Sequence, residues 1–380
     1  MNESRATRYQ RRQRRARAAG LASGGAMLTL LALTPAAGAL SGWAERLGRG
    51  LPAASHAVAS LVLFVIALVV IWELAVLPAV LYLCLAVDSR YGRRRPSVDE
   101  VLAAQGQATL VALPAAFLAA AVVQLAVWIA GSWWWPLAGL LLAAALVAAL
   151  HGAPALFVRI AGARPIARVR LVNRLAALAR DARVPIAGVH ELPPGDGRLT
   201  AFVTGAGRSR RIFIASELVR DWSDDEIAVV AAHELAHHAH HDLWRTLALD
   251  AALLSLGLWL ADALLAGSPA SPGAAGALLG AFPGELAALP FIALVAGVVW
   301  LAGTPLRLAH SRQQERRADR FALALTGGAD AFSAAIRRLG AQHLAEERPS
   351  TVTQWFYHRH PSVTERLAIA DQVRGAALRE

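Results

Sequence analysis

The chain has 380 residues, of which 56% are hydrophobic and only 17% charged, a balance that excludes an ordinary soluble globular protein. The formal net charge is +11, but the basic residues are all arginine and cluster beside apolar runs, as charges flanking membrane spans do, so they do not indicate nucleic-acid binding. The single cysteine, Cys84, excludes an intramolecular disulfide and a zinc site made of thiolates.

Residues 18–158 are predicted to form an N-terminal membrane region of about four spans. A basic N-terminal tail, residues 1–17, precedes them. The first apolar segment is either a cleavable signal peptide or a retained signal-anchor, and we favour the retained span. The second apolar run exceeds the length that one span needs, so it must tilt or bend at Pro78. The four expected spans are about 18–44, 57–87, 108–130 and 137–157.

Residues 159–245 differ from the region before them, because charges appear every few positions. We interpret them as a soluble insert with mixed helix and strand patterns. Within it, residues 200–205 and 211–214 are typical of two short strands of a hairpin. Residues 246–306 are expected to hold two further spans, and residues 307–380 form a charged C-terminal segment. These two spans are expected at about 246–266 and 286–305.

The predicted fold is mainly α: a multi-span transmembrane helical bundle with an inserted α+β domain that carries a small β-hairpin or sheet. With six spans, the arginine-rich segments all fall on one side of the membrane. These segments are the N-terminal tail, the loop at 88–106, the insert and the C-terminal segment. Because short cytoplasmic segments carry an excess of arginine, that side is predicted to be the cytoplasm. We therefore expect a multi-pass protein of the cell (inner) membrane with these segments cytoplasmic.

The insert contains the pattern HExxH, from His233 to His237. On a helix, residues four apart lie on the same face, so both imidazoles can bind one metal ion. Glu234 then lies beside a metal-activated water, where it can act as general base and later protonate the leaving amine. A capping box at Ser223–Glu226 predicts that a helix begins about three turns before this pattern. A chance match in a histidine-rich helix is the alternative.

A zinc ion in a protease also needs a third protein ligand and one open position. The candidate is Glu315, in a segment that we expect to be a helix ended by two glycines. Asp319 lies four residues later on the same face and can accept an N–H from a zinc-bound histidine. Both could instead be surface carboxylates of a charged helix. However, two spans separate His237 from Glu315, and this even number places both at the same membrane face.

Three more histidines follow the HExxH pattern: His238, His240 and His241. They suggest either a second metal site or a solvated helix end. We favour the solvated helix end, because these residues do not share the face of the first two histidines. Asp242 could help to position the helix.

At these residues the chain resembles the type I CAAX prenyl proteases, integral-membrane zinc endopeptidases whose relatives include bacterial heat-shock membrane proteases. The resemblance covers roughly residues 60–370, with HELAH at the metal motif. Residues 311–319 match the family's SRxxExxAD segment, which carries the third ligand. The segment from His360 to Arg366 resembles its HPxxxxR element, which implies that both residues face the active site and stabilise the developing oxyanion. The alternative is a structural His-Pro turn with a surface arginine.

In this family, the segment that corresponds to residues 200–205 begins with Asn-Ala, and its strand lines the cleft. Here Thr200 replaces the asparagine. An extended substrate could add to such a strand edge through main-chain hydrogen bonds.

We therefore expect a membrane-embedded zinc metalloendopeptidase, CAAX prenyl protease-like, with one zinc ion per chain held by the three ligands above. Its partners would be the lipid bilayer and peptide or protein substrates, including membrane-tethered ones. The alternatives are a regulatory protease that cuts a specific signalling protein, a catalytically idle membrane scaffold, and a transporter. The transporter is suggested by Glu73, Asp250 and Asp262, which lie in apolar runs. The intact metal motif argues against the scaffold, and the long soluble insert argues against the transporter.

Overall fold

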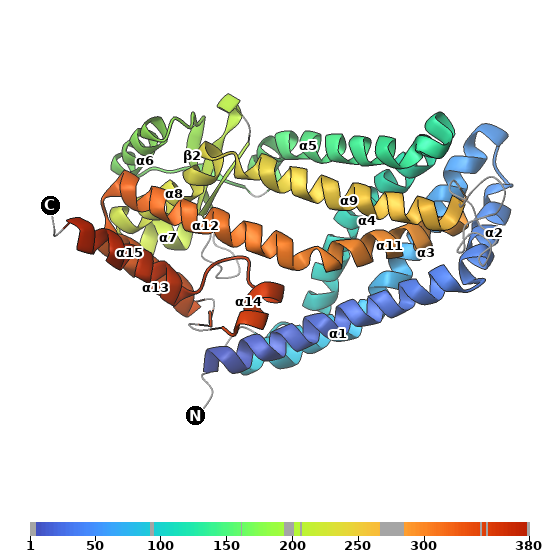
Figure 1. Cartoon of the computed structure of the whole chain (residues 1–380), viewed down its shortest axis with the longest axis horizontal. Coiled ribbons are helices and arrows are strands. Elements are labelled where there is room, and N and C mark those ends of the chain that lie inside the picture. Colours follow the sequence, from blue (N-terminus) through green and yellow to red (C-terminus); the bar gives the residue numbers. More distant parts are fainter. Residues whose placement is uncertain are drawn as a thin grey trace. The chain divides into compact units, whose positions relative to one another are not determined.

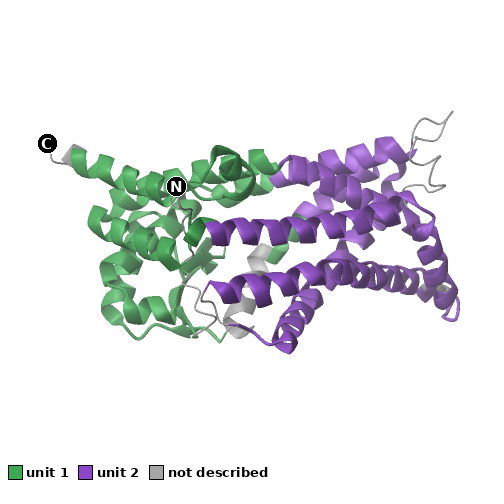
Figure 2. Cartoon of the chain, turned by 90° about the horizontal axis from the view of Figure 1, so that it is seen from below, with its two compact units in different colours: residues 1–7, 144–249, 304–380 green, residues 8–143, 250–303 purple. Residues whose placement is uncertain are grey.

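The computed structural model describes residues 5–91, 95–160, 162–193, 201–205, 207–266, 285–342, 344–346 and 349–377. The chain folds into two compact units that alternate along the sequence (Figure 2). Unit 1 comprises residues 1–7, 144–249 and 304–380, and unit 2 comprises residues 8–143 and 250–303.

Unit 2 is built from long apolar helices (Figure 1). Parts of α1, α5 and α9 extend into unit 1. Its elements in chain order are α1 (Arg5–Leu33), α2 (Ala36–Gly48), α3 (Ala53–Leu81), the π-helical η1 (Tyr82–Asp88), α4 (Val98–Ala130), η2 (Gly131–Trp133), α5 (Trp134–Ile160), α9 (Asp242–Ala266), η4 (Leu286–Ala288) and α11 (Leu289–Ala302).

Several of these helices are long and apolar enough to cross a membrane. Among the residues that the structure describes, four helical stretches meet this condition: Arg5–Leu33, Ser55–Asp88, Val98–Ala149 and Asp242–Ala266. The pair Leu286–Ala302 and Thr304–Thr326 adds a fifth if it is counted as one span. The third stretch contains the turn η2, where Gly131 has a φ of +54° that favours glycine. This turn separates α4 from α5, the helices at the positions predicted for two spans.

The first helix differs from the sequence prediction. It begins at Arg5 and ends at Leu33, so the basic residues 5–17 lie on the same helix as the apolar residues that follow, and the helix ends before the limit of the span predicted at 18–44. Arginine is a good helix former, which lets the basic segment continue the apolar helix. Pro35 lies at the N-cap of α2 and separates it from α1, because its ring removes a backbone N–H and clashes with the preceding turn. Tyr9 is fully buried, and its hydroxyl donates to Asp88 Oδ1 at 2.8 Å.

Small residues and polar pairs join the helices of unit 2. A Cβ added at Gly257 in α9 would lie 2.8 Å from Ala296 Cα in α11, so these helices approach too closely for a larger residue. The buried Trp134 donates its Nε1–H to Asp262 Oδ1 at 2.6 Å. Glu73 accepts a hydrogen bond from a glutamine of α4. Two of the acids that suggested a transporter therefore have hydrogen-bond partners within the helical unit.

Unit 1 contains a four-stranded sheet with the order β1-β2-β4-β3. The strands are β1 (Arg164–Pro165), β2 (Gly188–Leu192), β3 (Ala201–Thr204) and β4 (Arg211–Ala215). β3 and β4 are antiparallel, with Phe202 opposite Phe213, so the predicted hairpin is confirmed. β2 runs parallel to β4 on its other side, which leaves β3 as an edge strand.

The helices α6, α7 and α8 contact this sheet, and α8 also packs against α12, so these last two matter most for the site. The helices of unit 1 are α6 (Val169–Asp181), α7 (Ser216–Asp221), α8 (Asp224–Ala239), α12 (Thr304–Thr326), α13 (Ala329–Gln342), α14 (Thr351–Tyr357) and α15 (Val363–Ala377). Leu171 of α6, Ile212 of β4 and Leu235 of α8 are fully buried in one core. The predicted fold class, a multi-span helical protein with a small sheet, is confirmed.

Candidate metal centre

Helix α8 carries the HExxH pattern, and its N-terminus is fixed as the sequence predicted. The Ser223 hydroxyl accepts from the Glu226 backbone N–H, and the Glu226 carboxylate accepts from the Ser223 backbone N–H. Arg338 of α13 adds two hydrogen bonds of 3.1 Å to the same carboxylate. Because this capping box anchors the helix start, the two histidines are held at a defined depth in unit 1.

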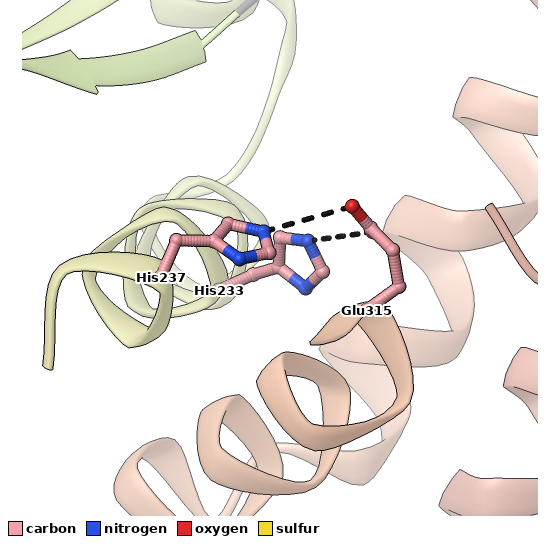
Figure 3. A group of neighbouring side chains, drawn as sticks. All are labelled: His233, His237 and Glu315. Atoms are coloured by element: carbon pink, nitrogen blue, oxygen red, sulfur yellow. Dashed lines mark ion pairs between the residues drawn. The ribbon is translucent and has the colours of Figure 1, made fainter. Parts of the chain in front are cut away.

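His233, His237 and Glu315 point toward one another from α8 and α12 (Figure 3). One ligand atom from each lies within 4.8 Å of the other two. His233 Nε2 is 3.2 Å from Glu315 Oε2, and His237 Nε2 is 3.7 Å from Glu315 Oε1. A tetrahedral zinc ion with ligands at about 2.0–2.2 Å holds them about 3.3–3.6 Å apart. Two imidazoles and one carboxylate at these separations could hold a metal ion, and the two printed contacts to Glu315 lie close to the spacing that zinc requires.

Each histidine also faces a second carboxylate through its other ring nitrogen. His233 Nδ1 is 2.9 Å from Asp319 Oδ1, and His237 Nδ1 is 2.9 Å from Asp242 Oδ2. Both aspartates are buried. A hydrogen on Nδ1 directed at a carboxylate leaves the lone pair of Nε2 free to bind a metal ion. Both rings are thus oriented with Nε2 toward Glu315.

Asp242 is a site residue whose contact with His237 sequence reasoning missed. It was expected only to help position the helix, yet its carboxylate also accepts from Arg317 of α12. Its main-chain carbonyl accepts from Gln314 Nε2 at 3.2 Å. The signal in the sequence is an aspartate five residues after the second histidine. The turn that brings it back depends on His241, whose φ of +57° is rare for a residue other than glycine.

The environment of the ligands favours positive charge. Burial opposes protonation of His233, but hydrogen bonds to Asp319 and Glu315 outweigh it and raise the pKa of His233 to about 9. This raised pKa means that the surrounding carboxylates stabilise a cation at this position. A divalent metal ion satisfies the same carboxylates once His233 has lost its proton.

Glu234 lines a cavity of about 440 Å³ in unit 1 together with His237 and Glu315. Burial raises the pKa of the Glu234 carboxyl above its ordinary value. A carboxylate with a raised pKa can accept a proton from water near neutral pH and return it to a leaving group. Val203, Thr204 and Gly205 line the same cavity, so the edge strand β3 borders it. Thr200 lies outside the described residues.

His360 lies in the loop between α14 and α15. Its Nδ1 is 2.8 Å from Glu315 Oε2, although the side chain is 54% exposed. The buried Arg312 holds this loop, because its Nη1 donates to the main-chain carbonyls of Gln354 at 2.7 Å and His358 at 2.8 Å. His360 therefore contacts Glu315, the predicted metal ligand on α12.

Arg366 contacts Asp319 and not a predicted metal ligand. Its Nε donates to Asp319 Oδ2 at 2.9 Å, and its Nη2 donates to Asp319 Oδ1 at 2.5 Å. Asp319 thus joins Arg366 to His233. The structure places Arg366 behind the carboxylate that orients His233, and its part in binding an oxyanion stays a prediction.

The three histidines after the HExxH pattern were considered as a second metal site. Within the part of the chain that the structure describes, the group that can hold a metal ion is made by the three predicted ligands. At this helix end His238 and His240 are partly exposed, and each contacts a neighbouring element. His238 Nε2 is 3.1 Å from Val203 O, and the His240 ring packs edge-on against Phe321. The polar histidines at this helix end contact the strand and helix beside it.

Comparison with known proteins gives a consistent result. The model of peptidase family M48 matches residues 166–374, more than half of the chain. A Bacillus subtilis (strain 168) protein described as an uncharacterized metalloprotease, YhfN, is 28% identical over 214 residues, which are 56% of this chain and 50% of that protein. Protease HtpX of Xylella fastidiosa (strain M12) is 28% identical over 222 residues, 53% of this chain and 72% of that protein. The chain thus spans half the length of the Bacillus protein.

A solved structure extends the likeness in fold beyond the matched segment. The crystal structure of S. mikatae Ste24p has a TM-score of 0.71 with this chain at 17% sequence identity. The match covers 87% of this chain and 79% of that one. It therefore includes the helical unit as well as the unit that carries the candidate metal centre.

Proposed function

The chain belongs to peptidase family M48, and from this premise we propose that it is a membrane-embedded, zinc-dependent endopeptidase. One observation carries the proposal. Two histidines of α8 and a glutamate of α12 place their ligand atoms within 4.8 Å, and Glu234 borders the same cavity. These are the parts that zinc-assisted peptide hydrolysis needs: three ligands, an open position and a base.

His233, His237 and Glu315 would hold the zinc ion. When bound, zinc supplies a Lewis acid that makes water acidic near neutral pH and draws charge from a carbonyl oxygen. Asp319 and Asp242 keep the two imidazoles in the orientation that binding requires. The three ligands would thus be set before a substrate enters.

Glu234 would carry the proton. Its carboxylate accepts the proton of the attacking water and later gives it to the amine that leaves. Burial raises the pKa of Glu234, so at neutral pH its carboxyl group takes up a proton and gives it away with more nearly equal ease. His360, next to Glu315, would donate a hydrogen bond to the oxygen on which negative charge develops.

The substrate would be an extended peptide segment. The open edge of β3 borders the cavity and offers main-chain groups for pairing. The resemblance to type I CAAX prenyl proteases favours C-terminal tails or membrane-tethered segments. The distribution of arginine favours the cytoplasmic face as the place of hydrolysis.

Zinc content and peptide cleavage of the purified full chain test this function. Glu234→Gln should keep one zinc ion per chain and lose cleavage, since the amide cannot accept the proton. Glu191→Gln on β2, outside the cavity, is the matched control and should behave as the wild type. Chelation should abolish cleavage, and added zinc should restore it. Wild-type protein that binds zinc but cleaves no peptide supports the scaffold alternative, and wild-type protein that binds no zinc overturns the proposal.

A further inference from the structure

His238 links helix α8 to the edge strand of the sheet. It directly follows His237 in the chain, and its Nε2 is 3.1 Å from the main-chain oxygen of Val203 in β3. Both residues line the cavity that contains Glu234. The strand edge is therefore tied to the helix at the position next to a predicted metal ligand.

Arg210 determines the direction of this hydrogen bond. Its Nε is 3.2 Å from His238 Nδ1, and a guanidinium can only donate. Nδ1 is thus the acceptor, so the ring hydrogen is on Nε2 and is donated to Val203 O. Arg210 also donates from Nη1 to Gly207 O at 3.0 Å, in the turn between β3 and β4. One arginine therefore fixes both the imidazole and the turn that follows the edge strand.

The contact at Val203 shows which main-chain groups of β3 face the open edge. In an antiparallel ladder, the N–H and C=O of one residue point to the same side, and the side alternates from residue to residue. Val203 is paired in register with Ile212 of β4, but its oxygen is bound by His238 of α8. Val203 therefore faces away from β4, and so does Ala201 two residues before it. The outward oxygen of Val203 is already bound by His238, so a substrate strand on this side would pair through the remaining outward groups, such as those of Ala201.

We propose that His238 is a positioning residue that sets the place of the edge strand relative to His237 and Glu234, and so fixes which peptide bond of an extended substrate is cut. The inference rests on the proposed function. Successive peptide bonds of a peptide paired with β3 are about 3.3 Å apart, so a displacement of β3 by about this distance would bring a neighbouring bond in front of Glu234.

The test compares His238→Ala with His238→Gln and His240→Ala in the full chain loaded with zinc. The glutamine side chain keeps an N–H that can reach a carbonyl, and His240 contacts Phe321 instead of β3. Cleavage products of one extended peptide are identified by mass spectrometry. His238→Ala should cut at neighbouring bonds and lose about tenfold in kcat/KM for the original bond, the effect of one hydrogen bond. His238→Gln should restore the original bond, and His240→Ala should keep it.

Hydrogen exchange of residues 201–205 in the same zinc-loaded proteins gives a second measurement that needs no activity. Exchange should be faster in His238→Ala than in wild type or His240→Ala, because the strand loses its link to α8. Faster exchange with an unchanged cleavage site would make the link merely structural and overturn the proposal. Unchanged exchange would also overturn it. Wild-type protein that cleaves no peptide would instead overturn the proposed function, and the exchange data would keep the two failures apart.

Discussion

Replacing Asp319 by asparagine tests the contact that joins Arg366 to His233. Asp319 is fully buried, receives two hydrogen bonds from Arg366 and lies 2.9 Å from His233 Nδ1. The substitution keeps the shape of the side chain and removes its charge. The asparagine side chain keeps one oxygen as an acceptor, but its NH2 group replaces the other and faces a donor of Arg366 or His233, and both neighbours lose the negative charge.

The expected magnitudes follow from these contacts. Loss of a carboxylate behind a metal-binding histidine typically lowers metal affinity about 10–100-fold, or about 1.4–2.7 kcal/mol. Breaking a buried ion pair by removing one partner typically costs about 3–5 kcal/mol of stability. The Arg366 side chain is 15% exposed, so little solvent is at hand to replace the lost carboxylate. We therefore expect a variant that is both less stable and a poorer zinc binder.

Zinc affinity is measured by competition with a chelator, and stability by thermal unfolding of the zinc-free protein in detergent. Arg366→Gln and the double variant complete a double-mutant cycle, in which the two losses of stability should sum to more than the loss in the double variant. Asp330→Asn is the matched control, since its pair with Arg374 is exposed and contributes little. An Asp319→Asn variant with wild-type zinc affinity would refute the orienting role, and strictly additive losses would refute the coupling.

Three further changes test other contacts. Although burial opposes it, hydrogen bonds hold the pKa of Glu226 below its usual value. The ionised Glu226 therefore stabilises the folded protein fully above about pH 4.3, and this stabilisation is lost as the pH falls through the lower folded-state pKa. In Glu226→Gln, the free energy of unfolding should fall less steeply as the pH is lowered through this range. Asp242→Asn should lower zinc affinity about 10–100-fold in chelator competition, and an unchanged value would mean that its 2.9 Å contact does not orient the ligand histidine. Trp134→Phe should lower the free energy of unfolding by about 1–3 kcal/mol, because the part-buried Asp262 loses its donor. The exposed Trp133→Phe, measured in the same thermal scan, should leave stability unchanged.

Local patterns in the sequence were sufficient for the centre of the candidate site. These patterns all belong to regular helices, in which the spacing of two residues determines whether their side chains share a face. They are the spacing of His233 and His237, the capping box before them and the family resemblance at Glu315. The family resemblance is confirmed by the match to peptidase family M48. The partner of His237 could not be found in this way. Asp242 reaches it only because His241 adopts a left-handed backbone conformation, for which a histidine gives no signal.

The same distinction applies to the fold. The apolar helices and the hairpin were predicted because each has its own pattern of hydrophobic residues. The start of α1 was not predicted. Near this start, Tyr9 is held by a hydrogen bond to Asp88, which is 79 residues away in the chain. The strands β1 and β2 were also missed as elements, since β1 has only two residues and β2 gains its place by pairing with β4. These elements depend on contacts between segments that are far apart in the chain, and such contacts cannot be seen in a short stretch of sequence.

The alternation of the two units along the sequence has a consequence for the timing of biosynthesis. The proposed ligand Glu315 follows His237 by 78 positions, and α9 and α11 must be made between them. At about 5–20 residues per second, the ribosome needs about 4–16 s to bridge this interval. Throughout it, the emerging chain has its two histidines but lacks the glutamate that would complete the metal centre. Under the proposed function, the chain therefore has no hydrolytic capacity during this interval.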